Sequence, residues 1–115
     1  MSKAILAVED EFLILDYVAD ILTEAGFEVI TASNADEAIR VLEARTDIFA
    51  LLTDIDMPGS MDGLRLATAV RDQWPPIHVI VTTGKNIGRS LPPDTHFLPK
   101  PYTANALLSM VHRLH

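Results

Sequence analysis

The chain has 115 residues, a length typical of one domain and sufficient to bury a hydrophobic core. Its 16 acidic and 9 basic residues give a net charge of -7, which repels a phosphate backbone and argues against direct nucleic-acid binding. Cysteine is absent, so disulfides and thiolate metal sites are excluded. The N-terminus is unlike a signal peptide, and no apolar run approaches the ~20 residues of a membrane span. We therefore expect a single cytoplasmic domain, residues 1–115, without membrane contact.

Short apolar runs alternate with longer amphipathic stretches, which is typical of a parallel sheet covered by helices on both faces. In the first half of the chain, strands are predicted over residues 4–8, 28–32 and 49–53. The first helix is predicted over 12–25, where apolar residues recur at helical spacing and Gly26 provides a stop. Asn34 followed by Glu37 resembles a capping box and predicts the start of a second helix.

The second half continues this alternation. A third helix carries apolar residues at helical spacing and is expected to end before the WPP motif, because proline blocks its continuation. Strands are predicted over 78–82 and 96–99, and Thr103 is the predicted cap of a last helix. Between these strands, residues 84–95 (GKNIGRSLPPDT) contain two glycines and two prolines. This composition predicts one turn or an irregular loop in place of a regular helix.

Polar side chains follow the predicted strands, at the point where each strand ends. They are Glu9, Asp10 and Glu11 after the first strand, Asp54 and Asp56 after the third, Thr82 and Thr83 at the fourth, and Lys100 after the fifth. The carboxyl ends of parallel strands meet at one edge of the sheet, where ligands bind. Two carboxylates ~4 Å apart repel by ~4 kcal/mol at an effective dielectric constant of about 20, so such a cluster requires a cation, a proton or water.

Oxygen ligands without cysteine or clustered histidine favour a hard ion. Mg²⁺ accepts one or two carboxylates, keeps several waters and binds phosphate oxygens. An aspartate beside this ion can act as a nucleophile and form an aspartyl phosphate, while lysine and threonine side chains bind the other phosphoryl oxygens. The edge therefore indicates phosphoryl chemistry.

Four motifs resemble, in order and spacing, the receiver domain of two-component response regulators. They are the acidic pair in AVEDE, the aspartate of LLTDIDMP with MDG after it, the hydroxyl before glycine in VIVTTG, and FLPKPY. The resemblance covers essentially the whole chain. It implies an α/β fold, the flavodoxin-like doubly wound five-stranded parallel sheet with strand order 2-1-3-4-5. The fourth helix of that fold would here be shortened or irregular.

The resemblance also implies roles for the acidic residues. Asp54 would be the phosphoacceptor, because it ends the third strand and two residues separate it from the MP of LLTDIDMP. Asp10 would bind Mg²⁺ or Mn²⁺ directly, and Glu9 would hold a metal-bound water. Asp56 would offer its backbone carbonyl to the metal.

Further roles carried by the resemblance fall at the fourth and fifth strands. Lys100 would bridge to the phosphoryl group, and its peptide bond to Pro101 would be cis. Thr83 would be the switch hydroxyl because it immediately precedes Gly84; Thr82 cannot serve as well, since successive strand side chains point to opposite faces. Phe97 would be the aromatic rotamer switch.

The favoured hypothesis is a stand-alone receiver and not a turnover enzyme. A sensor histidine kinase or phosphotransfer protein would phosphorylate it, a downstream protein of unknown identity would read the signal, and homodimerisation is left open. One alternative is a haloacid-dehalogenase-like phosphohydrolase that uses the D-x-D of Asp54 and Asp56. That motif normally follows the first strand, and the chain is short for a cap domain. A flavodoxin-like cofactor binder is a third reading, which the acids at the phosphate-binding edge disfavour.

Overall fold

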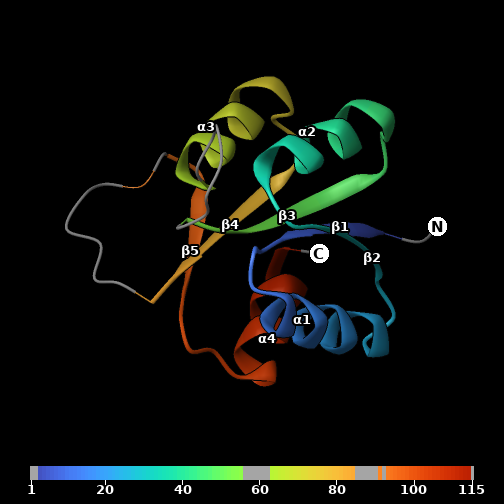
Figure 1. Cartoon of the computed structure of the whole chain (residues 1–115), viewed down its shortest axis with the longest axis vertical. Coiled ribbons are helices and arrows are strands. Elements are labelled where there is room, and N and C mark those ends of the chain that lie inside the picture. The colour runs from blue at the N-terminus through green and yellow to red at the C-terminus, as the bar shows by residue number, and fades with distance from the viewer. Residues whose placement is uncertain (1–2, 56–62, 85–90, 92, 115) are drawn as a thin grey trace.

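The computed structural model describes residues 3–55, 63–84, 91 and 93–114. Strands and helices alternate along the chain as far as β4, and β5 and one further helix follow (Figure 1). The elements are β1 (Ala4–Val8), α1 (Phe12–Glu24), β2 (Glu28–Ala32), α2 (Ala35–Ala44), β3 (Ile48–Asp54), α3 (Gly63–Gln73), β4 (His78–Thr83), β5 (Thr95–Pro99) and α4 (Ala104–Leu114). Each predicted strand agrees with the observed one to within one residue at either end.

The five strands form one parallel sheet in the order β2-β1-β3-β4-β5, which confirms the predicted topology. Helices α2 and α3 cover one face of the sheet, and α1 and α4 cover the other (Figure 1). Successive residues of a strand alternate between these two layers. In β3, Leu51 packs in the layer with α2 and α3, whereas Leu52 packs in the layer with α1 and α4. Both faces of the sheet are buried, and for this reason the strands are continuous apolar runs in the sequence.

Side-chain caps begin two of the helices as predicted. The Asn34 side chain accepts a hydrogen bond from the Glu37 amide at 2.9 Å, and the Thr103 hydroxyl accepts one from the Ala106 amide at 3.0 Å. Gly26 follows α1 with a φ of 100°, a left-handed conformation that favours glycine. These local signals explain why the boundaries of the helices could be predicted.

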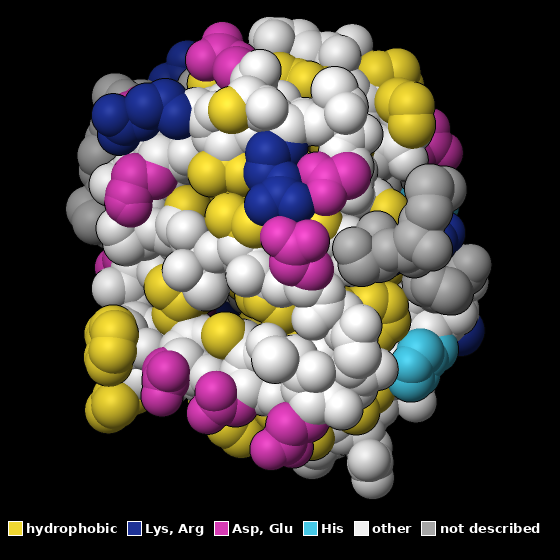
Figure 2. All heavy atoms as spheres, turned by 90° about the vertical axis from the view of Figure 1, so that its right-hand side faces the viewer, with side chains coloured by type: hydrophobic (Ala, Val, Ile, Leu, Met, Phe, Trp, Pro, Cys, Tyr) yellow, Lys and Arg dark blue, Asp and Glu magenta, His cyan; other side chains and the backbone are white. Residues whose placement is uncertain are grey.

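The segment between β4 and β5 was expected to be irregular. Residues 85–90 and 92 lie outside the described residues, so the expectation of a short fourth helix is not tested there. The described parts of the chain contain four helices, and none of them is long and apolar enough to cross a membrane. On the face that Figure 2 shows, acidic side chains are spread widely and basic ones are fewer.

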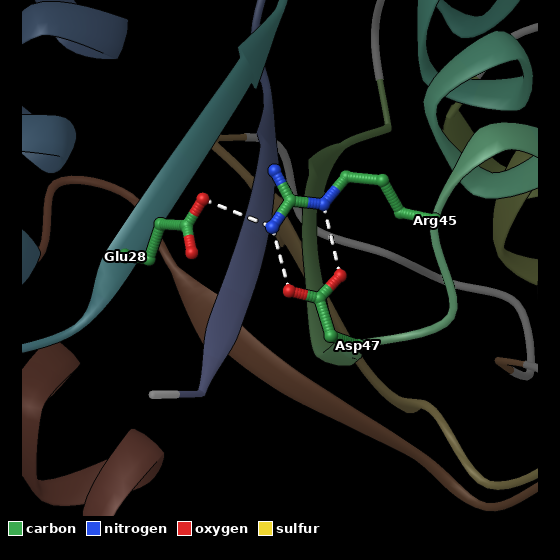
Figure 3. A network of polar contacts seen from close by, with 3 residues as sticks. All are labelled: Glu28, Arg45 and Asp47. Carbon is green, nitrogen blue, oxygen red and sulfur yellow. Dashed lines mark hydrogen bonds and ion pairs between the residues drawn. The ribbon is translucent and has the colours of Figure 1, made fainter. Parts of the chain in front are cut away.

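A polar network joins three elements where β2 and β3 begin (Figure 3). One guanidinium nitrogen of Arg45 lies 2.9 Å from a Glu28 carboxylate oxygen and 2.6 Å from one of Asp47. A second Arg45 nitrogen donates a hydrogen bond to the other Asp47 oxygen at 2.9 Å. This network lies at the end of the sheet opposite to the acidic edge.

Candidate functional site

The predicted acidic residues of β1 and β3 come together at the carboxyl edge of the sheet. Glu9 follows β1 and Asp54 ends β3, and these two strands are hydrogen-bonded neighbours. Both side chains are buried, whereas Asp10 is exposed. One carboxylate oxygen from each of the three residues lies within 4.8 Å of the others. The edge therefore holds two buried carboxylates and one at the surface.

Lys100 extends into this cluster from the end of β5. Its Nζ lies 2.7 Å from a Glu9 carboxylate oxygen and 3.2 Å from one of Asp54. The Lys100 backbone amide donates to the Thr83 carbonyl at 2.9 Å, which continues the pairing of β5 with β4 up to the site. The peptide bond between Lys100 and Pro101 is cis. One ammonium group thus lies between the two buried carboxylates.

The pKa values of Glu9 and Lys100 are both raised, but for different reasons. Burial raises the pKa of Glu9 and the nearby Asp54 charge adds to this, although hydrogen bonds from Lys100 and the Glu11 amide work against it. Burial alone would lower the pKa of Lys100, but its hydrogen bond to Glu9 and the charge of Asp54 raise that pKa overall. Lys100 therefore remains a cation at neutral pH, and ionised Glu9 is held at a cost in free energy.

The donor set fits a hard divalent cation. Glu9, Asp10 and Asp54 supply carboxylate oxygens, and Lys100 compensates only part of their charge. Oxygen donors with excess negative charge suit Mg²⁺ or Mn²⁺. Asp56, the fourth predicted contributor, lies outside the described residues.

The two threonines of β4 lie on different faces of the sheet. Asp54 pairs in register with Thr82, so their side chains leave the same face, and both line one small cavity. Thr83 is the next residue, so its side chain points to the opposite face. Its backbone carbonyl accepts the hydrogen bond from the Lys100 amide. The switch role of Thr83 stays a prediction.

Phe97 lies on the edge strand β5. It pairs with Val81, which packs in the layer with α2 and α3, and 37% of its surface is exposed. Its predicted role as a rotamer switch stays a prediction.

Tyr102 was not predicted as a site residue. It is half-buried and lines a surface hollow of about 400 Å³ together with Ile14, Tyr17, Gly84, Lys100 and Pro101. Burial raises the pKa of Tyr102, and the charges of Glu9 and Asp54 raise it further, so its phenol stays neutral. Only its position two residues after Lys100 could have pointed to it.

Gly63 was also missed, because its role depends on a close approach between backbones. A Cβ atom at this position would collide with the Asp54 carbonyl oxygen and lie 2.8 Å from the Ile55 Cα. The Gly63 amide donates to the Ile55 carbonyl at 3.0 Å. This first residue of α3 thus holds the end of β3 that carries Asp54.

Comparisons with known proteins agree with this geometry. The response regulator receiver domain family matches residues 5–112. A response regulator receiver protein of Anaeromyxobacter sp. is 34% identical over 110 residues, which cover 94% of this chain and 44% of that protein. The nitrogen assimilation regulatory protein NtrX of Azorhizobium caulinodans is 33% identical over 98% of this chain and 26% of its own length. The chain thus spans less than half the length of these two curated relatives.

Solved structures show the same fold. The chemotaxis response regulator CheY4 of Vibrio cholerae superposes with a TM-score of 0.87 at 27% identity, with 100% of both chains covered. A CheY-like receiver domain protein from Methanospirillum hungatei gives a TM-score of 0.91 at 29% identity, over 99% of this chain and 94% of that one.

The phosphohydrolase reading finds no support. The first aspartate of its D-x-D motif ends β3, the third strand of the chain, and the relatives reported above are regulators. One assignment accounts for the buried aspartate at the end of β3, the lysine after β5 and the match over nearly the whole chain. The chain belongs to the receiver domains of two-component response regulators.

Proposed function

We propose that this chain is a phosphoacceptor switch of a two-component phosphorelay and that Asp54 takes the phosphoryl group. One observation carries the proposal: Asp54 is a buried carboxylate that lies 3.2 Å from the Lys100 ammonium and close to two further carboxylates. A buried aspartate with an adjacent cation and metal-ligand oxygens is the arrangement that phosphoryl transfer to a carboxylate requires.

In the proposed step, an Asp54 carboxylate oxygen attacks the phosphorus of a phosphohistidine. The new P–O bond forms as the P–N bond breaks, and the departing imidazole keeps the electron pair and takes up a proton. No electron is lost or gained overall. Lys100 is placed to pair with a phosphoryl oxygen, because its ammonium already contacts the Asp54 carboxylate.

A divalent cation, Mg²⁺ or Mn²⁺, would be held by Glu9, Asp10 and Asp54 and by the backbone carbonyl of Asp56. When bound, it offsets the negative charge that the carboxylates and the phosphoryl oxygens bring together. Glu9 and Asp54 fix the inner side of this site through their strands, and Asp10 completes it from the surface.

Phosphorylation would add a charge of about -1.5 to -2 at Asp54. We propose that Thr83 and Lys100 then move toward the phosphoryl group and that Phe97 changes its rotamer with them. The phosphodonor would be a sensor histidine kinase or phosphotransfer protein, and a downstream protein would read the altered surface. The chain would act as a signalling acceptor and not as a turnover enzyme.

Intact-mass spectrometry tests the proposal directly. The protein is incubated with phosphoramidate, with and without Mg²⁺, and compared with Asp54→Ala and with Asp47→Asn as an exposed-acid control. We expect one phosphoryl adduct in the wild type and in the control, dependent on Mg²⁺, and none in Asp54→Ala. An equal adduct in Asp54→Ala would overturn the assignment.

A further inference from the structure

Two histidines from neighbouring strands lie close together near the amino ends of β4 and β5, away from the acidic edge. His78 begins β4, and His96 is the second residue of β5. Their ring centres are 6.4 Å apart, and the ring planes are inclined by 57°, so the rings do not stack. The two residues are far apart in the sequence, and the function proposed above assigns no role to either of them.

The register of the strands brings both imidazoles to one face of the sheet. His96 is the register partner of Ile80, and His78 lies two residues before Ile80 on the same strand. Ile80 packs in the layer of α1 and α4, and alternate residues of a strand share a face. Both histidines therefore lie on this face, where His78 is exposed and His96 is half-buried.

The separation of the two rings suits a shared metal ion. A metal–nitrogen bond of about 2.1 Å places the ring centre roughly 3 Å from the ion, so two imidazoles on one ion have their centres about 5 to 6 Å apart. The observed 6.4 Å is slightly longer. Rotation of the His78 side chain can close the difference, because that side chain is exposed.

His96 is held in the neutral form that binds metals. Burial lowers the pKa of His96, and the positive charges of His78 on β4 and Arg113 on α4 lower it further. A proton and a metal ion compete for the same imidazole nitrogen, so a lowered pKa reduces this competition at neutral pH. Arg113 would also repel a bound cation, but it is exposed, so solvent and salt screen this repulsion.

We propose that His78 and His96 form a binding site for a divalent transition-metal ion such as Ni²⁺, Cu²⁺ or Zn²⁺. Imidazole nitrogens favour these ions, whereas Mg²⁺ prefers the carboxylate oxygens of the acidic edge. Within the described residues, the group of three possible ligands that lie together is Glu9, Asp10 and Asp54, so water would complete the coordination at the histidines. The chain would then carry two metal sites of different chemistry.

A bound ion would link the edge strand β5 to its neighbour β4. An ion that binds only the folded state stabilises it by mass action. With two protein ligands, and thus roughly half the binding free energy of a four-ligand site, we expect a dissociation constant of about 1 to 100 µM. The inference goes beyond the proposed function and does not depend on phosphorylation of Asp54.

Titration of the untagged protein with Ni²⁺ tests the site. Isothermal titration calorimetry at pH 7.5, in excess Mg²⁺ that occupies the acidic edge, compares the wild type with His78→Gln and His96→Gln. We expect each substitution to weaken Ni²⁺ binding by about tenfold or more, because one of two ligands is lost. Binding to the wild type should weaken by about tenfold at pH 5.5, where protons compete for the imidazoles.

His112 and His115, the other two histidines of the chain, provide the matched control. They are three residues apart in the sequence and are the competing pair of imidazoles, so the double variant His112→Gln, His115→Gln should bind Ni²⁺ like the wild type. Circular dichroism checks that each variant is folded. Because His78 is exposed, His78→Gln should keep the fold, and it decides the question alone if His96→Gln does not fold.

Three results would overturn the inference. They are a wild type that binds no Ni²⁺ in excess Mg²⁺, a His78→Gln variant that binds as tightly as the wild type, and a loss of binding in the double control variant. Phosphorylation of Asp54 plays no part in these measurements, so failure of the metal site and failure of the proposed function are distinguishable.

Discussion

The two ends of the sheet each carry one cation between two carboxylates, but in different surroundings. At the amino end, Arg45 lies between Glu28 and Asp47, and 32 to 44% of these side chains is exposed (Figure 3). At the carboxyl end, Lys100 lies between Glu9 and Asp54, and only 7 to 18% is exposed. The ion-pair distances are similar, so burial is what distinguishes the two clusters.

The difference appears in the pKa values. At the amino end, the hydrogen bond from Arg45 lowers the pKa of Asp47, so the folded state favours the ionised acid. At the carboxyl end, burial raises the pKa of Glu9 in spite of its contact with Lys100. Similar groups thus form a stabilising surface network in one place and a strained, negatively charged site in the other. At neutral pH, a bound cation would offset this cost.

Removal of Lys100 should have the largest effect. Lys100→Met leaves Glu9 and Asp54 as buried carboxylates without their ammonium partner, and should lower the free energy of unfolding by about 1–3 kcal/mol without divalent cations. Phosphorylation by phosphoramidate should slow by about 100-fold or more, because the charge on the phosphoryl oxygens is no longer offset. Chemical denaturation and the phosphorylation rate measure the two effects.

Arg45→Met is the matched control for this variant. Its partners are exposed to solvent, so both stability and phosphorylation should change less than in Lys100→Met. Equal losses in the two variants would contradict the distinction between the buried and exposed clusters.

Substitution of Gly63 should have the next largest effect. Gly63→Ala places a Cβ atom against the Asp54 carbonyl, and we expect a loss of about 1–3 kcal/mol in the free energy of unfolding, as in other overpacked sites. A Cβ at Gly84 would lie 3.8 Å from the Lys100 Cβ, an ordinary contact, so Gly84→Ala is the control. If thermal denaturation finds the two variants equally stable, the close approach at Gly63 does not hold the end of β3.

Neutralisation of Glu9 should stabilise the protein. Its folded-state pKa is raised above the ordinary 4.5, so the contribution of Glu9 is fully present below that pH and is lost as the pH rises through the raised pKa. Without divalent cations, Glu9→Gln should therefore melt at a higher temperature than the wild type at pH 7, and this difference should shrink toward pH 4.5. Mg²⁺ should stabilise the wild type more than the variant. A variant that melts lower at pH 7 would contradict the raised pKa.

The smallest effect is expected at Asp47, with the opposite sign. Its pKa is lowered from 3.8, so its contribution is present above that pH and is lost as the pH falls through the lowered pKa. Asp47→Asn should melt slightly lower than the wild type at pH 7, and added salt should reduce the difference. If Asp47→Asn melts above the wild type, Asp47 destabilises the folded protein as Glu9 does. The contrast in stability between the two ends of the sheet would then be wrong.

Site residues that lie at the end of a strand could be predicted from the sequence alone. Glu9, Asp54 and Lys100 each follow a predicted strand, and parallel topology alone brings such residues to one edge. The helix caps at Asn34 and Thr103 were equally local and equally predictable.

Other features depend on tertiary contacts that no local pattern encodes. The face on which Thr82 lies is fixed by its register with Asp54, which requires the paired strands. Tyr102 acquires its environment only when the turn after β5 packs beside the acids, and Gly63 is constrained by a backbone that precedes it in the chain. Arg45 reaches Glu28 across 17 residues, so that network was not predicted either.

The central claim is that Asp54, at the buried, negatively charged edge of the sheet, accepts a phosphoryl group. Borohydride reduction of the phosphorylated protein converts an aspartyl phosphate to homoserine, and peptide sequencing by mass spectrometry then identifies the position. We predict homoserine at position 54 and nowhere else, and only when Mg²⁺ was present during phosphorylation. Homoserine at another aspartate, or none in a protein that carries the phosphoryl adduct, would contradict the account.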